Sequence, residues 1–396
     1  MGALLRDVQF VDYPTNPLVA LAVADMNNLS FVRSSSNQEV PFPVTRQNLF
    51  RGQLAAGDGD VQGPYVSQFL LQPTFFGAQP LTQQYQRFLS LSEGGADYMT
   101  SLSEYMSMQD GNVPKRQLAF DSSFRFIRMG RDLAAYTHVD VLHQAYFVAF
   151  LVLASIGAPL NPGNPYIGSQ AEHPFGTLGG HRRGGDDSRN GFARAQGFVV
   201  SQVDRQSAAA TGTVQAKLTH SRPMPQAAGA LHADVFNSAV LPIIHSTYGS
   251  FLLPQAFPEG APSHPCYPAG HGTVGGACIT AIKFFFDGSQ KIRPLLQAVG
   301  SDVMVPGRDG LSLIPYTDAD RDSLDINGEL VKLGANITFG HGIHAGIHFR
   351  SSSMQAMILG EQVALSVLQD RAGGYNEPFS ISIKKFDGSI ATITNQ

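Results

Sequence analysis

The chain has 396 residues, of which 43% are hydrophobic and 15% are charged, and its formal net charge is −4. This length and apolar content allow a large buried core, which argues against disorder and permits one large domain or two ordinary ones. The small negative charge excludes the basic field that nucleic-acid binding requires, and two cysteines are too few for a disulfide scaffold.

The N-terminal segment MGALLRDVQFVDYP has no uninterrupted apolar stretch followed by a cleavage site, so no signal peptide is visible. The most hydrophobic run, residues 145–158, ends at Pro159. It is shorter than the roughly 20 residues that cross a bilayer, and we interpret it as a buried central helix. We therefore expect a soluble protein without a membrane span, while its compartment stays open.

The predicted elements begin with a loop-rich segment, residues 1–81, which we expect to wrap a helical core. Helical spacing of apolar residues follows in residues 83–91, 96–106 and 123–155. A loop rich in glycine, proline and charge spans residues 159–189, and a second helical set begins near Phe192.

Two later helices are predicted at residues 273–286 and 353–368, the second after a capping cluster at residues 351–353. The chain ends differently, because residues 379–394 alternate apolar and polar side chains around Asp387 and Gly388. That pattern predicts a β-hairpin with a two-residue turn. The fold class is therefore mainly α, with a small C-terminal hairpin.

The segment HPCYPAGHGTVGGACIT, residues 264–280, carries two histidines on a Pro/Gly turn that enters a helix of small residues. Gly270 lets the backbone approach a ligand, and the free N–H groups of the helix start point outward. His271 stands in the first turn, where it can donate or accept a proton. This pattern predicts an oxyanion site, and a packing role for both histidines is the alternative.

Two further segments carry residues of the same chemistry. AKLTHSRP, residues 216–223, supplies Lys217, His220 and Arg222, and FGHGIHAGIHFR, residues 339–350, supplies three more histidines, His341, His344 and His348. With these motifs the chain resembles the vanadium-dependent haloperoxidases, in particular the algal and cyanobacterial bromoperoxidases. That family shares a superfamily with the type 2 phosphatidic-acid phosphatases and the bacterial acid phosphatases.

The resemblance covers nearly the whole chain, from GPYVSQFLL at residues 63–71 to KFDGS near the end. It implies one domain, residues 1–396, with a helical-bundle core. Its parts would be a loop-rich wrap (1–81), a core that holds the site (82–376) and a β-hairpin (377–396).

The resemblance also implies a vanadate cofactor, held between the helices with His348 as the axial ligand of vanadium(V). His271 would be the acid-base residue, and Gly270 and His341 would adjoin the anion. Lys217 and Arg222 would neutralise the equatorial oxygens and polarise bound peroxide. His264 stands where related bromoperoxidases carry a second histidine that tunes halide preference.

Several positions depart from the family pattern. Ala269 stands where the family has serine, Gly342 where it has arginine, and Ser352 where it usually has aspartate. The step from Lys217 to Arg222 is also shorter than the family's. Losing one arginine and one serine contact to the anion costs about 3–5 kcal/mol, and a protonated His341 would return part of this.

The resemblance implies oxidation of bromide or iodide by hydrogen peroxide to hypohalous acid, which halogenates an organic acceptor. Two alternatives stay open: a homologue without vanadate that acts as a structural or assembly protein, and an acid phosphatase with His348 as nucleophile and His271 as acid. Assembly into a homo-oligomer, a dimer or larger, is expected from the family and from the low-charge surface.

Overall fold

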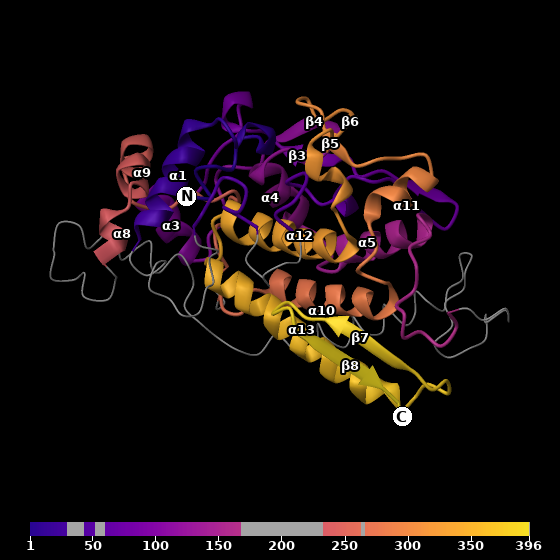
Figure 1. Cartoon of the computed structure of the whole chain (residues 1–396). Coiled ribbons are helices and arrows are strands. Elements are labelled where there is room, and N and C mark those ends of the chain that lie inside the picture. The colour runs from indigo at the N-terminus through magenta and orange to yellow at the C-terminus, as the bar shows by residue number, and fades with distance from the viewer. Residues whose placement is uncertain (30–42, 52–59, 168–232, 263–265, 396) are drawn as a thin grey trace.

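The computed structural model of the chain describes residues 1–29, 43–51, 60–167, 233–262 and 266–395 (Figure 1). Helices dominate this part of the chain, and its strands form two-stranded antiparallel pairs: β1–β2, β3–β4, β5–β6 and β7–β8. The prediction of a mainly α fold with a small C-terminal hairpin is confirmed. No helix of the described residues is long and apolar enough to cross a membrane.

The centre of the core is a pair of helices, α10 (Gly270–Phe285) and α13 (Arg350–Ala372), which lie side by side in Figure 1. Their backbones touch, because a Cβ atom built on Gly276 would lie 1.9 Å from the carbonyl oxygen of Met357. One built on Gly360 would lie 2.0 Å from the carbonyl oxygen of Thr273. Small residues therefore let these helices approach more closely than ordinary side chains allow.

The two helices run parallel, since Gly272 meets Ser353 and Gly276 meets Met357 further along both. Their first turns therefore lie together at one end of the pair. A backbone hydrogen bond of 3.2 Å from the N–H of Ala269 to the carbonyl of Ser352 joins the two starts.

Helix α12 (Ile326–Phe339) packs beside this pair and carries a buried ion pair, Glu329 with Lys332 at 2.5 Å. The pair ties the segment 62–68 to the helices of the core. The Lys332 ammonium donates to the carbonyl of Gln62 at 2.7 Å, and the Glu329 carboxylate accepts from the N–H of Gln68 at 2.7 Å. These contacts satisfy backbone groups that the wrap would otherwise bury without partners.

The remaining elements surround this centre. The helices are α1 (Pro17–Asn28), α3 (Leu102–Gln109), α4 (Gly130–His138), α5 (Gln144–Ser155), α8 (Ala233–Asn237), α9 (Val240–Tyr248), α11 (Ile292–Ala298) and a short π-helical turn, η6 (Gly340–His344). The strands are β1 (Thr74–Phe76), β2 (Gln79–Leu81), β3 (Tyr85–Phe88), β4 (Phe120–Arg125), β5 (Met304–Pro306), β6 (Leu313–Pro315), β7 (Ser380–Lys384) and β8 (Ile390–Thr394).

Three expected helices differ from the structure. The helix predicted at residues 83–91 is wrong, because this segment forms β3 and pairs with β4. The segment 123–155 is not one helical stretch but the end of β4, then α4, then α5. The helix expected at 96–106 begins only at Leu102, where Ser101 caps it. In a segment of only a few residues, pairing with a neighbouring strand determines the conformation more strongly than the spacing of apolar residues does.

The helix that begins near Phe192 lies outside the described residues. The segment 1–81 contains a helix that sequence reasoning missed, α1, which Asn16 caps by accepting from two backbone N–H groups. Residues 351–353 do not cap α13, since its N-cap is Phe349 and the serines lie inside the helix.

The C-terminal hairpin forms as expected, but its connection is longer than two residues. The N–H of Gly388 donates to the carbonyl of Lys385, and the N–H of Lys385 donates to the carbonyl of Ser389. Gly388 has a φ of 82°, which favours glycine at this position of the turn.

The hairpin is anchored to α10 and α13 by two buried ionisable side chains. The Lys283 ammonium donates to the carbonyl of Lys384 at 3.0 Å, and the Glu361 carboxylate accepts from the N–H of Phe386 at 2.7 Å. Burial raises the pKa of Glu361 to about 7, against the effects of this hydrogen bond and of Lys283. The hairpin thus packs along the C-terminal halves of the two helices, away from their starts (Figure 1).

The contact between α10 and α13 leads to a stability prediction. Replacing Gly276 with alanine places a methyl group on the Met357 carbonyl, so we expect the free energy of unfolding to fall by at least about 2 kcal/mol. Urea unfolding followed by circular dichroism measures it. Gly373→Ala is the matched control, because no atom of the described residues lies within 4 Å of its Cβ position. Equal stability of the two variants would contradict the close contact.

Candidate active site

The start of α10 has features that helix ends which bind anions share. Ala269 is the N-cap, with extended backbone, and no side chain caps the first turn. Among the described residues, nothing lies within 4 Å of a Cβ atom built on Gly270. The first N–H groups of a helix have no partner within it, so they remain available to a ligand in that space.

His271 follows in the first turn and is held by an acid that the sequence pattern did not reveal. Its Nε2 lies 2.9 Å from Oδ1 of Asp140, and both side chains are almost fully buried. Asp140 comes just after α4, where Val139 leaves the helical conformation. Because residues 123–155 were expected to be helical throughout, sequence reasoning gave no reason to expect an acid turned toward α10.

His341 lies between the other two imidazoles. Its ring stacks on that of His271, with centroids 3.9 Å apart and planes at 24°. The ring of His348 is 5.9 Å from that of His341 and inclined by 45°. Three histidines from the segments 270–285 and 340–348 thus come together, as expected from the sequence.

His344 is not part of this cluster. It packs edge-on against Phe50 at 4.6 Å and fills the space beside Gly130, where a Cβ atom would lie 2.3 Å from its Nδ1. Burial lowers its pKa to about 3. The π-helical turn η6 therefore places His341 toward the site and His344 in the core.

The electrostatics of His341 favour its neutral form. Burial, and then the neighbouring His271 and His348, lower the pKa of His341 well below the usual 6.5. Its Nδ1 has no hydrogen-bond partner within the described ranges. A neutral imidazole can donate or accept one hydrogen bond at each nitrogen but gives no positive charge to an anion.

Gly342, where the related family has arginine, is packed against the site. Its Cβ position lies 2.9 Å from Oγ of Ser353 and 3.1 Å from Cβ of His348. A side chain at residue 342 would thus require one of these neighbours to move. Oγ of Ser353 is buried without a hydrogen-bond partner among the residues that the structure covers, so it is a further group that a ligand could contact.

Three expected site residues, Lys217, Arg222 and His264, lie outside the described residues. Those that are described are Gly270, His271, His341 and His348, which gather at the joined starts of α10 and α13. In the described part of the chain, no group of three or more His, Cys, Asp or Glu side chains is arranged to hold a metal ion. The arrangement brings three imidazoles to the N–H groups at the start of α10, which suits an oxyanion.

Comparison with known proteins finds relatives over almost the full chain. A vanadium-dependent bromoperoxidase of Corallina pilulifera is 27% identical over an alignment of 463 positions, which covers 99% of this chain and 72% of the relative. One of Ascophyllum nodosum is 28% identical over 417 positions, which covers 98% and 69%. No protein-family model matches the chain.

The fold has a counterpart among solved structures. The homohexameric second vanadate-dependent bromoperoxidase of Ascophyllum nodosum superposes with a TM-score of 0.79 at 25% sequence identity. The match covers 99% of this chain and 69% of that one. The resemblance drawn from the sequence is therefore confirmed.

The neutral state of His341 can be tested in the protein without added anion. Because its pKa is lowered, we expect the ring resonance of His341 to stay unchanged from about pH 7.5 down to about pH 6, where an ordinary histidine titrates. NMR of protein labelled at the histidine rings measures this, with His341→Gln to assign the signal. A midpoint near 6.5 would contradict it.

The same lowered pKa has a consequence for stability. Below about pH 6.5 the unfolded chain binds a proton at His341 that the folded protein does not, so the free energy of unfolding falls as the pH is lowered.

Proposed function

Because the chain is a homologue of the vanadium-dependent haloperoxidases, we propose that it oxidises bromide or iodide with hydrogen peroxide to hypohalous acid, which halogenates an organic acceptor. The observation that supports this most is the position of His271, bonded to the buried Asp140, in one cluster with His348. Two imidazoles, one of them held by a carboxylate, thus lie at the same helix start, which supports one role in proton transfer and one as a ligand.

The described residues fit a bound oxyanion. His348 would provide an imidazole nitrogen to hold the anion, and the N–H groups at the start of α10 would contact anion oxygens beside Gly270. The start of α13 adds the partial positive charge of a second parallel helix. We assign Lys217 and Arg222 the remaining neutralisation of charge. Vanadate, when bound, would supply Lewis-acid activation of the peroxide.

His271 would move the proton that peroxide brings. Asp140 accepts from its Nε2–H, which leaves Nδ1 to exchange a proton with the reacting oxygen. A buried carboxylate in this position also fixes the orientation of the ring and stabilises the imidazolium that forms during transfer. Asp140 is therefore a positioning residue for His271.

The positions that differ from the family pattern change the expected affinity for vanadate and leave the proposed reaction the same. Ala269 and Gly342 supply no hydrogen-bond donors from their side chains, and a neutral His341 does not replace the charge of an arginine. We therefore expect vanadate to bind more weakly than it would with the family's arginine and serine. The homohexameric relative also supports assembly of this chain into a homo-oligomer.

The proposed activity is tested by bromination of monochlorodimedone with hydrogen peroxide and bromide, with and without orthovanadate. We expect turnover that depends on vanadate and that falls at least about 100-fold in His348→Ala. Binding of vanadate, followed by ⁵¹V NMR, should weaken in the same variant. His245→Ala is a matched control, since this histidine stacks on Phe251 away from the cluster.

Failure to oxidise either bromide or iodide at saturating vanadate would overturn the haloperoxidase proposal. Hydrolysis of p-nitrophenyl phosphate that is lost in His348→Ala would then favour the phosphatase alternative. Absence of both activities, with no binding of vanadate or phosphate, would favour a structural or assembly role.

The role of Asp140 gives a separate prediction. Asp140→Asn keeps the size of the side chain but removes the carboxylate, so kcat should fall by about 10²-fold or more while vanadate binding is retained. The two measurements are the bromination assay at saturating vanadate and ⁵¹V NMR. Loss of vanadate binding together with activity would instead mean that Asp140 builds the anion site itself.

A further inference from the structure

Both histidines of the stacked pair make a polar contact with one short segment, residues 137–140. Oδ1 of Asp140 lies 2.9 Å from Nε2 of His271. Burial lowers the pKa of His341, and a hydrogen bond between its ring and the backbone of Thr137 opposes this. The segment includes the end of α4 and the two residues that follow it. The orientation of both rings therefore depends on where this segment lies.

The residues around Asp140 are held by little apolar packing. Val139, where the chain leaves α4, is 89% exposed, and Val141 is 57% exposed. The second carboxylate oxygen of Asp140, Oδ2, has no hydrogen-bond partner among the described residues. Because a segment with few buried apolar contacts opens easily, polar contacts beside it become important for its position.

One such contact is a second histidine–carboxylate pair at the end of α4. Nε2 of His138, the last residue of this helix, lies 2.5 Å from Oε1 of Glu259. Burial would raise the pKa of Glu259, but the hydrogen bond with His138 lowers it below its usual value. The side chain of Glu259 is 52% exposed and that of His138 is 16% exposed. The pair thus links the surface of the protein to the end of α4.

The ring of His138 also belongs to a row of rings that reaches the cluster. It stacks on Phe257, with centroids 4.2 Å apart and planes at 26°. Phe257 lies 5.9 Å from the ring of His341, which stacks on His271. The row therefore has an imidazole at each end, and each of these two imidazoles is hydrogen-bonded to a carboxylate.

We propose that Glu259 is a positioning residue for the pair formed by His271 and Asp140. By holding His138, it fixes the end of α4 and so the carboxylate that bonds to His271. Phe257 keeps the same helix end against His341. The effect of Glu259 on turnover rests on the proposed haloperoxidase function, whereas its effect on His271 does not.

The test follows the Nε2–H proton of His271 in protein without added anion. NMR of protein labelled at the histidine rings measures its exchange with solvent, and His271→Gln assigns the signal. A proton in a buried hydrogen bond exchanges when that bond opens. In Glu259→Ala we expect exchange to be about 10-fold faster or more, because a hydrogen bond to a charged group is lost.

A second variant tests whether Glu259 acts through His138. His138→Phe keeps an aromatic ring beside Phe257 but cannot bond to Glu259, so exchange at His271 should increase as in Glu259→Ala. The double variant should show no further increase, because both changes remove the same contact. Glu259→Gln keeps an acceptor oxygen at the same reach and should have a smaller effect than Glu259→Ala.

Asp322→Ala is the matched control. Asp322 is 64% exposed and lies 2.5 Å from Arg293, which is 17% exposed, so this pair resembles that of Glu259 and His138 in exposure and distance. Arg293 belongs to α11, which lies away from the starts of α10 and α13 in Figure 1. We expect exchange at His271 to be unchanged in this variant.

The bromination assay gives a second readout. In Glu259→Ala, kcat at saturating vanadate should fall by about 10-fold, while ⁵¹V NMR shows that vanadate still binds. If the protein oxidises no halide, the exchange measurement still tests the role of Glu259, since it needs neither vanadate nor halide.

Three results would overturn the inference. They are unchanged exchange at His271 in Glu259→Ala, an equal increase in Asp322→Ala, and a fall in kcat without faster exchange. Thermal unfolding of each variant shows that it is folded. Faster exchange that is confined to the variants of Glu259 and His138 supports the positioning role.

Discussion

The candidate site depends on the direct backbone contact between α10 and α13. Gly276 against Met357 and Gly360 against Thr273 bring two parallel helices together without intervening side chains. Their first turns therefore lie at one place, joined by the hydrogen bond from Ala269 to Ser352. Because each helix start carries partial positive charge, the same contact that builds the core also creates an environment suited to an anion.

The histidines of the cluster come from the first turn of α10 and from the segment that leads into α13. His271 belongs to the first turn of α10, whereas His348 lies two residues before α13 begins. The π-helical turn η6 rotates the chain so that His341 stacks on His271 while His344 enters the core. Gly342 packs between Ser353 and His348. An arginine at residue 342 would need a different turn. The glycine at this position and the stacking of His341 on His271 therefore belong to the same local backbone conformation.

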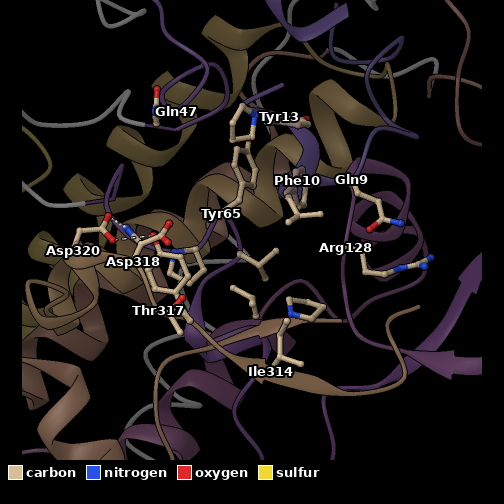
Figure 2. A pocket seen from close by; sticks show the side chains of 18 of the residues that line it. Gln9, Phe10, Tyr13, Gln47, Tyr65, Arg128, Ile314, Thr317, Asp318 and Asp320 are labelled. Carbon is tan, nitrogen blue, oxygen red and sulfur yellow. Dashed lines mark hydrogen bonds between the residues drawn. The ribbon is translucent and has the colours of Figure 1, made fainter. Parts of the chain in front are cut away.

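Sequence alone predicted the elements whose signals are local. The Pro/Gly turn before His271, the small residues of α10 and the alternation of the hairpin each follow from nearby residues, and the family resemblance added the link to His348. Sequence missed Asp140 and β3, because both depend on partners far along the chain: α10 for the acid and β4 for the strand. The cavity lined by Phe10, Tyr65 and Ile314 (Figure 2) was missed for the same reason, since its walls come from separate segments of the chain.

The parallel pair also explains why the altered positions need not abolish anion binding. The partial positive charges at two adjacent helix starts repel each other weakly when no negative charge lies between them. Burial strengthens this repulsion because the protein interior screens charges less than water does. An oxyanion bound there removes the repulsion and gains hydrogen bonds from N–H groups that have no partner within the helices. These contributions come from the backbone, so they remain when Ala269 and Gly342 replace side-chain donors. Affinity for the proposed anion would then rest more on the helix contact and less on individual side chains, which would make the glycines of α10 and α13 part of the site.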